Sequence, residues 1–207
     1  MNGWESILPL VSSQEASFTA IEQTIRLFHH RWSVPIIATL YRDRGCRFVV
    51  LANRLNASRD TLSETLTALI ANGLVMRNPG YGHPLRPEYI LTPPGEAVGA
   101  TCIELAAVVS GEGLLKLALK KWPMTVLAAV GRGATRFGEI KAMLAGLHAR
   151  SLALALKDLE SAGLLERRIS AGYPPAPAYH LTAKAERIFP VLDRFVDACE
   201  SLPPADA

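Results

Sequence analysis

The chain has little of what defines several large classes of protein. Its 207 residues include only three cysteines, Cys46, Cys102 and Cys199, which are too scattered to form a disulfide framework or a metal-binding motif. No uninterrupted apolar segment reaches the roughly 18 residues of a membrane span. The N-terminal residues lack the basic start of a signal peptide. These absences predict a soluble, cytoplasmic protein with no membrane partner.

The net charge is also small, and motifs typical of enzymes are missing. Lys and Arg exceed Asp and Glu by only three, 22 against 19, which permits an anionic partner without demanding one. A nucleophile elbow, a phosphate-binding loop and a zinc-protease helix motif are all missing, so we predict no enzymatic activity and no cofactor. His29 and His30 are adjacent, so they lie about 100° apart on a helix and cannot comfortably face one metal ion.

What the sequence does contain is one segment that occurs twice. Residues 58–77, SRDTLSETLTALIANGLVMR, combine an N-cap at Ser58, a leucine stripe at helical spacing and a stop at Asn72-Gly73. The short apolar stretch after the glycine ends in Arg77, which is typical of a strand. Residues 150–167, RSLALALKDLESAGLLER, repeat the stripe, the glycine and the strand. This order predicts the reading helix and wing of a winged helix-turn-helix domain.

The repeat extends beyond that segment, at an offset of about ninety residues. Trp122 matches Trp32, and the Tyr-x-Leu-Thr of residues 179–182 matches that of residues 89–92. So many anchors in the same order predict two domains in tandem. The predicted divisions are a lead-in over residues 1–20, a first domain over 21–110, a second over 111–201 and a tail over 202–207. The predicted fold class is mainly α with small β-hairpin wings, an α+β chain of two tandem winged helix-turn-helix domains.

Apolar spacing and turn residues predict the individual elements. In the first domain we expect helices around Ile21–Phe28, Ile36–Leu40, Phe48–Leu55 and Gly95–Ser110, with a polar loop from Tyr41 to Cys46. Strands at Leu74–Arg77 and Glu88–Thr92 are expected to enclose a loop rich in glycine and proline. A terminal helix over residues 184–201 carries Ile188, Leu192, Phe195 and Val196 on one face. We expect this apolar face to be exposed on one chain, and it therefore predicts a homodimer.

At these anchors the chain resembles the HxlR family of bacterial transcriptional regulators. The family pattern is a tryptophan, Arg-Phe, a serine-capped helix, Gly-Leu-x-x-Arg, a proline-rich wing and Tyr-x-Leu-Thr. The matching residues here are Trp32, Arg47-Phe48, Ser58, Gly73–Arg77, Pro84, Pro87 and Tyr89–Thr92. The resemblance implies winged-helix domains that bind double-stranded DNA in the major groove and dimerise through terminal helices. Because members usually carry one domain and pair, two domains in one chain suggest a covalently linked pseudo-dimer.

In the first domain, the candidates for DNA contact are reading-helix residues off the leucine stripe and basic residues of the wing. Polar side chains in the groove read base edges, and basic residues hold phosphates. The helix candidates are Ser58, Arg59, Asp60, Ser63, Glu64 and Thr67, and the wing candidates are Arg77, His83 and Arg86. We expect Arg59 and Ser63 to reach the DNA. The alternative is a merely solvated helix face and polar loop.

The second domain departs from this pattern. Its helix is expected to present His148, Arg150, Ala153, Leu154 and Ala155. The LALAL run leaves few groups that can hydrogen-bond to base edges, and so apolar a surface favours burial against the other half, another subunit or a hydrophobic ligand. Arg167 and Arg168 in the second wing keep phosphate contact open, as do His148 and Arg150. We therefore expect the first domain to do most of the base reading.

The sequence thus predicts a DNA-binding transcriptional regulator, more specifically a repressor that occludes a promoter, with a small-molecule effector as a further candidate partner. The alternative is a winged-helix protein-interaction module that has lost base-specific DNA reading. Cys46 offers another form of control, because Arg44 and Arg47 nearby could lower the pKa of its thiol and favour redox sensing. A plain loop or core thiol is the simpler alternative for that residue.

Overall fold

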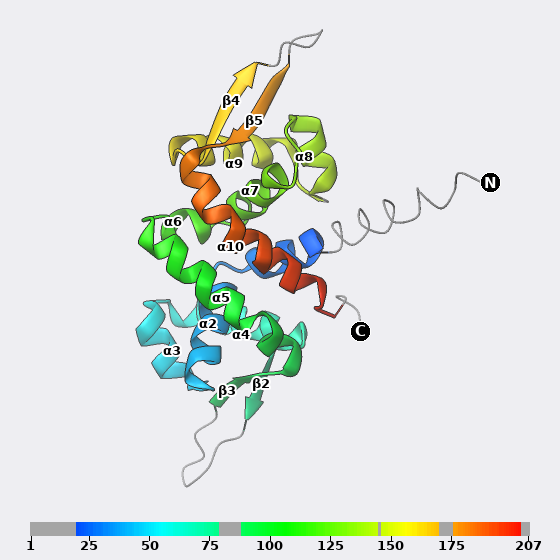
Figure 1. Cartoon of the computed structure of the whole chain (residues 1–207). Helices are drawn as coiled ribbons and strands as arrows, with labels where there is room; N and C mark the ends of the chain where they lie inside the picture. Colours follow the sequence, from blue (N-terminus) through cyan, green and yellow to red (C-terminus); the bar gives the residue numbers. More distant parts are fainter. Residues whose placement is uncertain (1–19, 79–87, 145, 170–175, 204–207) are drawn as a thin grey trace, which may run out of the picture.

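The computed structural model describes residues 20–78, 88–144, 146–169 and 176–203. The chain forms two halves with the same order of elements, and their wings project from opposite ends of the molecule (Figure 1). The first half contains a helix over residues 20–29, α2 (Ser33–Asp43), β1 (Cys46–Arg47), α3 (Phe48–Leu55), α4 (Arg59–Ala71), β2 (Val75–Asn78), β3 (Glu88–Leu91) and α5 (Pro93–Gly111). The second half contains α6 (Leu115–Ala118), α7 (Pro123–Gly131), α8 (Phe137–Met143), α9 (Ala149–Ser161), β4 (Leu165–Ile169), β5 (Pro177–Leu181) and α10 (Ala183–Glu200).

Each half carries an antiparallel wing beside its helices. In the first half β2 pairs with β3, from Val75 opposite Leu91 to Asn78 opposite Glu88, and β1 pairs with the other edge of β3. In the second half β4 pairs with β5, and an isolated bridge from Arg136 takes the place of β1. The predicted fold class is therefore confirmed: the chain is mainly α, with two small hairpin wings.

The threonine of each Tyr-x-Leu-Thr motif ties three elements together. The hydroxyl of Thr92 donates to the carbonyl of Gly73, just after α4, at 2.5 Å. The same oxygen accepts from the backbone N–H of Gly95, in the first turn of α5, at 3.3 Å. Thr182 caps α10 in the same way and donates to the carbonyl of Gly163 at 2.7 Å. One side chain in each half therefore links the end of the reading helix, the wing and the long terminal helix.

The two halves pack through α5 and α10, which lie together at the centre of the molecule (Figure 1). The predicted apolar face of α10 is buried, since Ile188, Leu192, Phe195 and Val196 expose no more than 1% of their surface. Phe195 meets Phe28 of the first half edge-on, with 5.6 Å between ring centroids. The premise of the homodimer prediction, an uncovered terminal helix, is therefore wrong, because the chain covers this face itself.

The contact between α5 and α10 joins equivalent positions of the repeat. A nitrogen of the Arg194 guanidinium lies 2.6 Å from a carboxylate oxygen of Glu104, and these residues are ninety positions apart. If two identical halves met here, like charges would face each other. Because the pair is exposed, it contributes at most about 1 kcal/mol to the free energy of unfolding. The opposite charges nevertheless favour pairing of unlike halves.

A large side chain and a glycine have exchanged places between the halves. Tyr41 of α2 lies over Gly99 of α5, where an added Cβ would come within 2.1 Å of the ring. In the second half Phe189 of α10 lies over Gly131 of α7, where an added Cβ would come within 2.0 Å of the ring. An aromatic ring thus fills the same gap in both halves but comes from opposite helices. The exchange keeps a ring packed against a glycine in each half, although Tyr41 remains 39% exposed and Phe189 is only half-buried.

Several boundaries differ from those expected, and three of the differences have a clear physical reason. Helix α2 continues through Asp43 and ends at Arg44, which adopts a left-handed conformation with φ of 56°, so the predicted loop is shorter. Cys46 and Arg47 form β1, because they pair with β3 far along the chain. Helix α5 begins at Pro93, since Thr92 leaves the strand to cap the helix. In the part of the chain that the structure describes, no helix is both long and apolar enough to cross a membrane.

Candidate nucleic-acid interface

The reading helix of the first half, α4, begins and ends as predicted. The hydroxyl oxygen of Ser58 accepts from the backbone N–H of Thr61 at 3.3 Å and caps the helix. The leucine stripe is buried at 2% exposure or less: Leu62, Leu66 and Leu69. Gly73 follows the helix with φ of 68°, the left-handed conformation that glycine adopts at low cost. The opposite face of α4 is consequently held toward solvent.

That outer face carries the predicted contact residues. All six are exposed: Ser58, Arg59, Asp60, Ser63, Glu64 and Thr67. Among the described residues Arg59 has no hydrogen-bond or ion-pair partner, so its guanidinium is available to a phosphate or a base edge. Thr67 donates its hydroxyl proton to the carbonyl of Ser63 at 2.9 Å, which leaves its lone pairs for a base donor. The face therefore combines a cation with hydroxyl and carboxylate groups, the groups that read base edges.

The equivalent helix α9 presents a different face. His148 stands at the N-cap without a side-chain cap bond, and His148, Arg150, Ala153 and Leu154 are exposed. Leu154 exposes 60% of its surface, so the predicted burial against the other half is wrong for this residue. Ala155 was expected on the outer face but is buried at 3%, because it belongs to the stripe that packs into the core. The helix thus offers solvent three basic residues, His148, Arg150 and Lys157, around one large apolar side chain.

The wings place basic side chains at the two ends of the molecule. Arg77 on β2 and Arg167 on β4 are exposed and have no ion-pair partner among the described residues. Arg168 is exposed but pairs with Glu166 on its own strand, which reduces its electrostatic attraction for phosphate. The remaining wing candidates, His83 and Arg86, lie outside the described residues.

Two lysines beside α9 were not identified from the sequence. Lys120 Nζ lies 2.6 Å from Oδ2 of Asp158 on α9, and Lys121 Nζ lies 4.8 Å from the ring centroid of Trp122. In the first half Arg31 lies 5.6 Å from the ring centroid of the matching tryptophan. A cation directly before each repeated tryptophan was a visible signal, since cations bind aromatic faces. Both lysines lie next to the second reading helix, where Asp158 offsets the charge of Lys120 and Lys121 stays without an ion-pair partner among the described residues.

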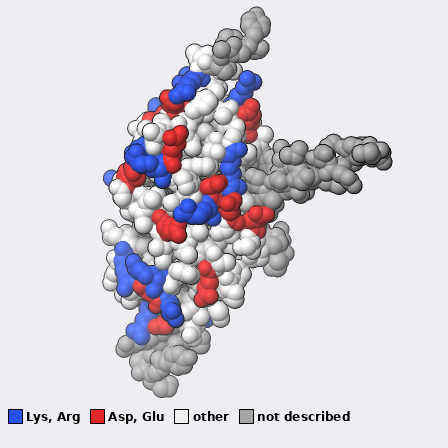
Figure 2. All heavy atoms as spheres, in the orientation of Figure 1, with Lys and Arg blue, Asp and Glu red and all other residues white. Residues whose placement is uncertain are grey.

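The central face of the molecule has mixed charge. Figure 2 shows basic and acidic side chains interspersed on the side where α5 and α10 lie in front. Arg194 pairs with Glu104, and Arg187 lies 3.4 Å from Glu112. Such paired charges attract a phosphate backbone weakly, so this face is a poor candidate for DNA contact.

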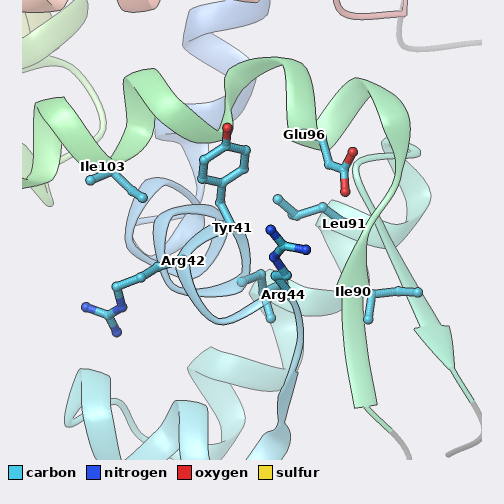
Figure 3. Close-up of a pocket in the computed structure, with 8 residues that line it drawn as sticks. Tyr41, Arg42, Arg44, Ile90, Leu91, Glu96 and Ile103 are labelled. Atoms are coloured by element: carbon cyan, nitrogen blue, oxygen red, sulfur yellow. The ribbon is translucent and has the colours of Figure 1, made fainter.

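A cleft of about 660 Å³ lies in the first half, between the end of α2, strand β3 and α5. Figure 3 shows Arg44 and Glu96 extending toward each other across it, with Leu91 beside them and Tyr41 on the wall formed by α2. Neither Arg44 nor Glu96 has an ion-pair partner among the described residues. The cleft therefore offers one free charge of each sign beside apolar side chains.

The second half has an ion pair where the first half has this cleft. Nε of Arg132 lies 2.7 Å from Oδ1 of Asp193, and the guanidinium also pairs with Asp197, which joins α7 to α10. In the first half Ile103 occupies the position equivalent to Asp193. The arginine equivalent to Arg132 is Arg42, which pairs with the next residue in the chain, Asp43. The residues at these equivalent positions therefore differ between the two halves.

The thiol of Cys46 is less acidic than expected. The residue is buried at 7% exposure, and this burial raises the pKa of the Cys46 thiol above its ordinary value. The expectation of a lowered pKa is therefore wrong, because burial outweighs the opposing effects of Arg47 and Arg42 on the pKa of this thiol. Burial also raises the pKa of Cys102, and it raises the pKa of Cys199 to about 12. Thiols of this kind are poor nucleophiles.

Comparison with known proteins agrees with the repeated architecture. The family model described as HxlR-like helix-turn-helix matches the chain twice, over residues 27–112 and 117–205. An uncharacterized HTH-type transcriptional regulator of Methanothermobacter thermautotrophicus is 37% identical over 73 residues, which are 35% of this chain and 56% of that protein. A protein of Synechocystis with the same description is 32% identical over 91 residues, 44% of this chain and 67% of that protein.

Other relatives show similar coverage. YvaP of Bacillus subtilis, also described as an uncharacterized HTH-type transcriptional regulator, is 34% identical over 73 residues, 35% of this chain and 68% of that protein. The chain thus spans between about half and two thirds of the length of these relatives. No solved structure matches the chain significantly.

Proposed function

Because the chain belongs to the HxlR-like helix-turn-helix family through two separate segments, we propose that it regulates transcription by binding double-stranded DNA as a pseudo-dimer within one chain. The observation that carries the proposal is the repetition of an exposed reading helix and a basic wing in two halves that α5 and α10 hold together. The similarity to relatives described as HTH-type transcriptional regulators supports it. The limits of the two DNA-binding units in this proposal are residues 21–110 and 111–201.

The two halves make different contacts with the DNA in this proposal. In the first half Arg59 and Ser63 on α4 contact base edges, and Arg77 holds the phosphate backbone. In the second half Arg150 and Arg167 hold the backbone, and α9 contributes less hydrogen bonding to bases. Most base discrimination therefore resides in the first half.

One chain supplies both reading helices, so a second copy is not needed to occupy an operator. The apolar faces of the terminal helices are already buried within the chain, which removes the main reason for a homodimer. A protein bound at two half-sites of a promoter excludes other proteins from it, and on this basis we propose repression. The cleft beside Arg44 and Glu96 is the candidate site for a small-molecule effector, because it borders both a wing strand and α5.

The second candidate function is a protein-interaction module that has lost DNA reading. The exposed side chain of Leu154 and the modest net charge of +3 favour it. The free guanidinium of Arg59 and the basic residues of both wings favour DNA binding. Salt separates the two functions, since phosphate contacts make DNA affinity fall steeply as salt rises.

The test is binding to the DNA upstream of the gene that encodes the chain, at low and moderate salt, in the presence of competitor DNA. We expect specific binding that Arg59→Ala weakens at least tenfold, within the range of about 1–3 kcal/mol for a base contact. The matched control is Arg187→Ala, which removes an exposed arginine of α10 that pairs with Glu112 and should leave affinity unchanged. If Arg59→Ala binds the specific DNA as tightly as the native chain does, base reading would be assigned to α9 instead. If the chain binds no specific operator, the protein-interaction module would be favoured.

A further inference from the structure

The outer face of α9 differs from that of α4 in a way that points to a particular base. The outer residues of α4 are mostly polar or charged, whereas the equivalent residues of α9 are Ala149, Arg150, Ala153, Leu154 and Lys157. Leu154 occupies the position of Glu64, ninety residues earlier, and exposes 60% of its surface. The small side chain of Ala153 beside it leaves the leucine prominent. A large aliphatic group is thus presented where the first half presents a carboxylate.

Two lysines lie beside this leucine, and one of them is paired with an aspartate. The residues that line a small cavity of about 110 Å³ along α9 include Leu154, Ser151, Asp158, Lys120, Lys121 and Trp122. Asp158 holds the ammonium of Lys120 against the helix at 2.6 Å, and the ring of Trp122 holds that of Lys121. Asp158 offsets the charge of Lys120, whereas Lys121 has no ion-pair partner among the described residues. In the first half histidine takes the place of Lys120, so this arrangement belongs to the second half.

The combination of one apolar group and a neighbouring unpaired lysine fits duplex DNA better than a protein surface. Lysine is depleted in protein–protein interfaces, whose centres are broad apolar patches. DNA places phosphates at both sides of the major groove, and thymine alone among the four bases presents a methyl group there. Contact with that methyl removes apolar surface of both partners from water, which is favourable and needs no hydrogen-bonding group.

We infer that Leu154 reads the 5-methyl group of a thymine in the half-site bound by the second half, while Lys121 holds a phosphate beside it. The inference rests on the proposed function, because it requires α9 to enter the major groove. It makes the operator asymmetric: one half-site is read through hydrogen bonds from α4, and the other through thymine methyl contact with α9.

The experiment uses the full chain and operators selected from random duplex DNA. Thymine is replaced by deoxyuridine, which lacks only the methyl group, in one half-site at a time. Uracil in one particular half-site should weaken binding by about fourfold, the factor that burial of one methyl-sized group provides. Uracil in the other half-site should have no effect. Leu154→Ala should bind the thymine operator about fourfold more weakly and should respond to uracil in neither half-site.

Leu115→Ala is the matched control, because it shortens an exposed leucine of α6 outside the reading helices and should retain the full response to uracil. Equal affinity of the native chain for both uracil-substituted operators and the thymine operator would overturn the inference. So would a Leu154→Ala variant with unchanged affinity, which would instead make this leucine a contact for a protein partner. If selection returns no specific sequence, the proposed function itself fails.

Discussion

Replacing Gly99 by alanine tests the exchange of packing between the two halves. The added Cβ would lie 2.1 Å from the ring of Tyr41, well inside contact distance, so the ring or α5 must move. Overpacking of this kind costs about 1–3 kcal/mol, whereas alanine in a helix otherwise gains about 0.5–1 kcal/mol over glycine. We therefore expect Gly99→Ala to lower the free energy of unfolding by about 1–2 kcal/mol.

A double substitution tests the same site more sharply. Tyr41→Gly with Gly99→Phe copies the arrangement of Gly131 and Phe189 in the second half. Tyr41→Gly alone removes a packed ring, and Gly99→Phe alone adds a ring where one already lies. We expect the double variant to be more stable than the sum of the two losses predicts, with a coupling free energy of about 1–3 kcal/mol.

The assay is urea denaturation followed by circular dichroism, applied to the native chain, both single variants and the double variant. Gly138→Ala on α8 is the matched control, because no atom lies within 4 Å of the added Cβ. The free energy of unfolding of this variant should exceed that of the native chain by about 0.5–1 kcal/mol. Losses at Tyr41 and Gly99 that add to within about 0.5 kcal/mol would refute the idea that one ring fills one shared gap.

Three further predictions concern local features of the chain. Ser58→Ala removes the cap of α4 and should cost about 1 kcal/mol in a thermal melt, and an unchanged melting temperature would contradict the cap. Glu139 accepts backbone N–H groups of Arg136 and Thr135 at 2.9 Å each, which lowers the pKa of its carboxyl in the folded state. Its stabilisation is therefore present above the unfolded pKa and is lost as pH falls through the folded pKa, so Glu139→Gln should flatten the acid side of the stability profile. Burial of Cys46 raises the pKa of its thiol, so iodoacetamide at neutral pH should modify it more slowly than free cysteine, and peroxide should leave DNA binding unchanged.

The sequence predicted the features that depend on near neighbours. The cap at Ser58, the leucine stripe of α4 and the stop at Gly73 each follow from the conformational preferences of a few adjacent residues. The offset of ninety residues revealed the second half, because the two copies of Tyr-x-Leu-Thr place a capping threonine at the same point of each fold.

The features that depend on packing between residues far apart in the chain could not be predicted from the sequence. Strand β1 exists because Cys46 pairs with Tyr89, and no local pattern encodes that partner. The burial of Ala155 beside the exposed Leu154 depends on how α9 meets its neighbours, and helical spacing alone left both on the outer face. The apolar face of α10 was recognised correctly, but only the fold reveals that α5 and the N-terminal helix cover it.

The most direct test of the central claim is the mass of the protein–DNA complex, measured by sedimentation on a selected operator. If one chain supplies both reading helices, the complex contains one chain of 22.4 kDa per operator, and that single chain protects two half-sites. Two chains per operator, each protecting one half-site, would contradict the account.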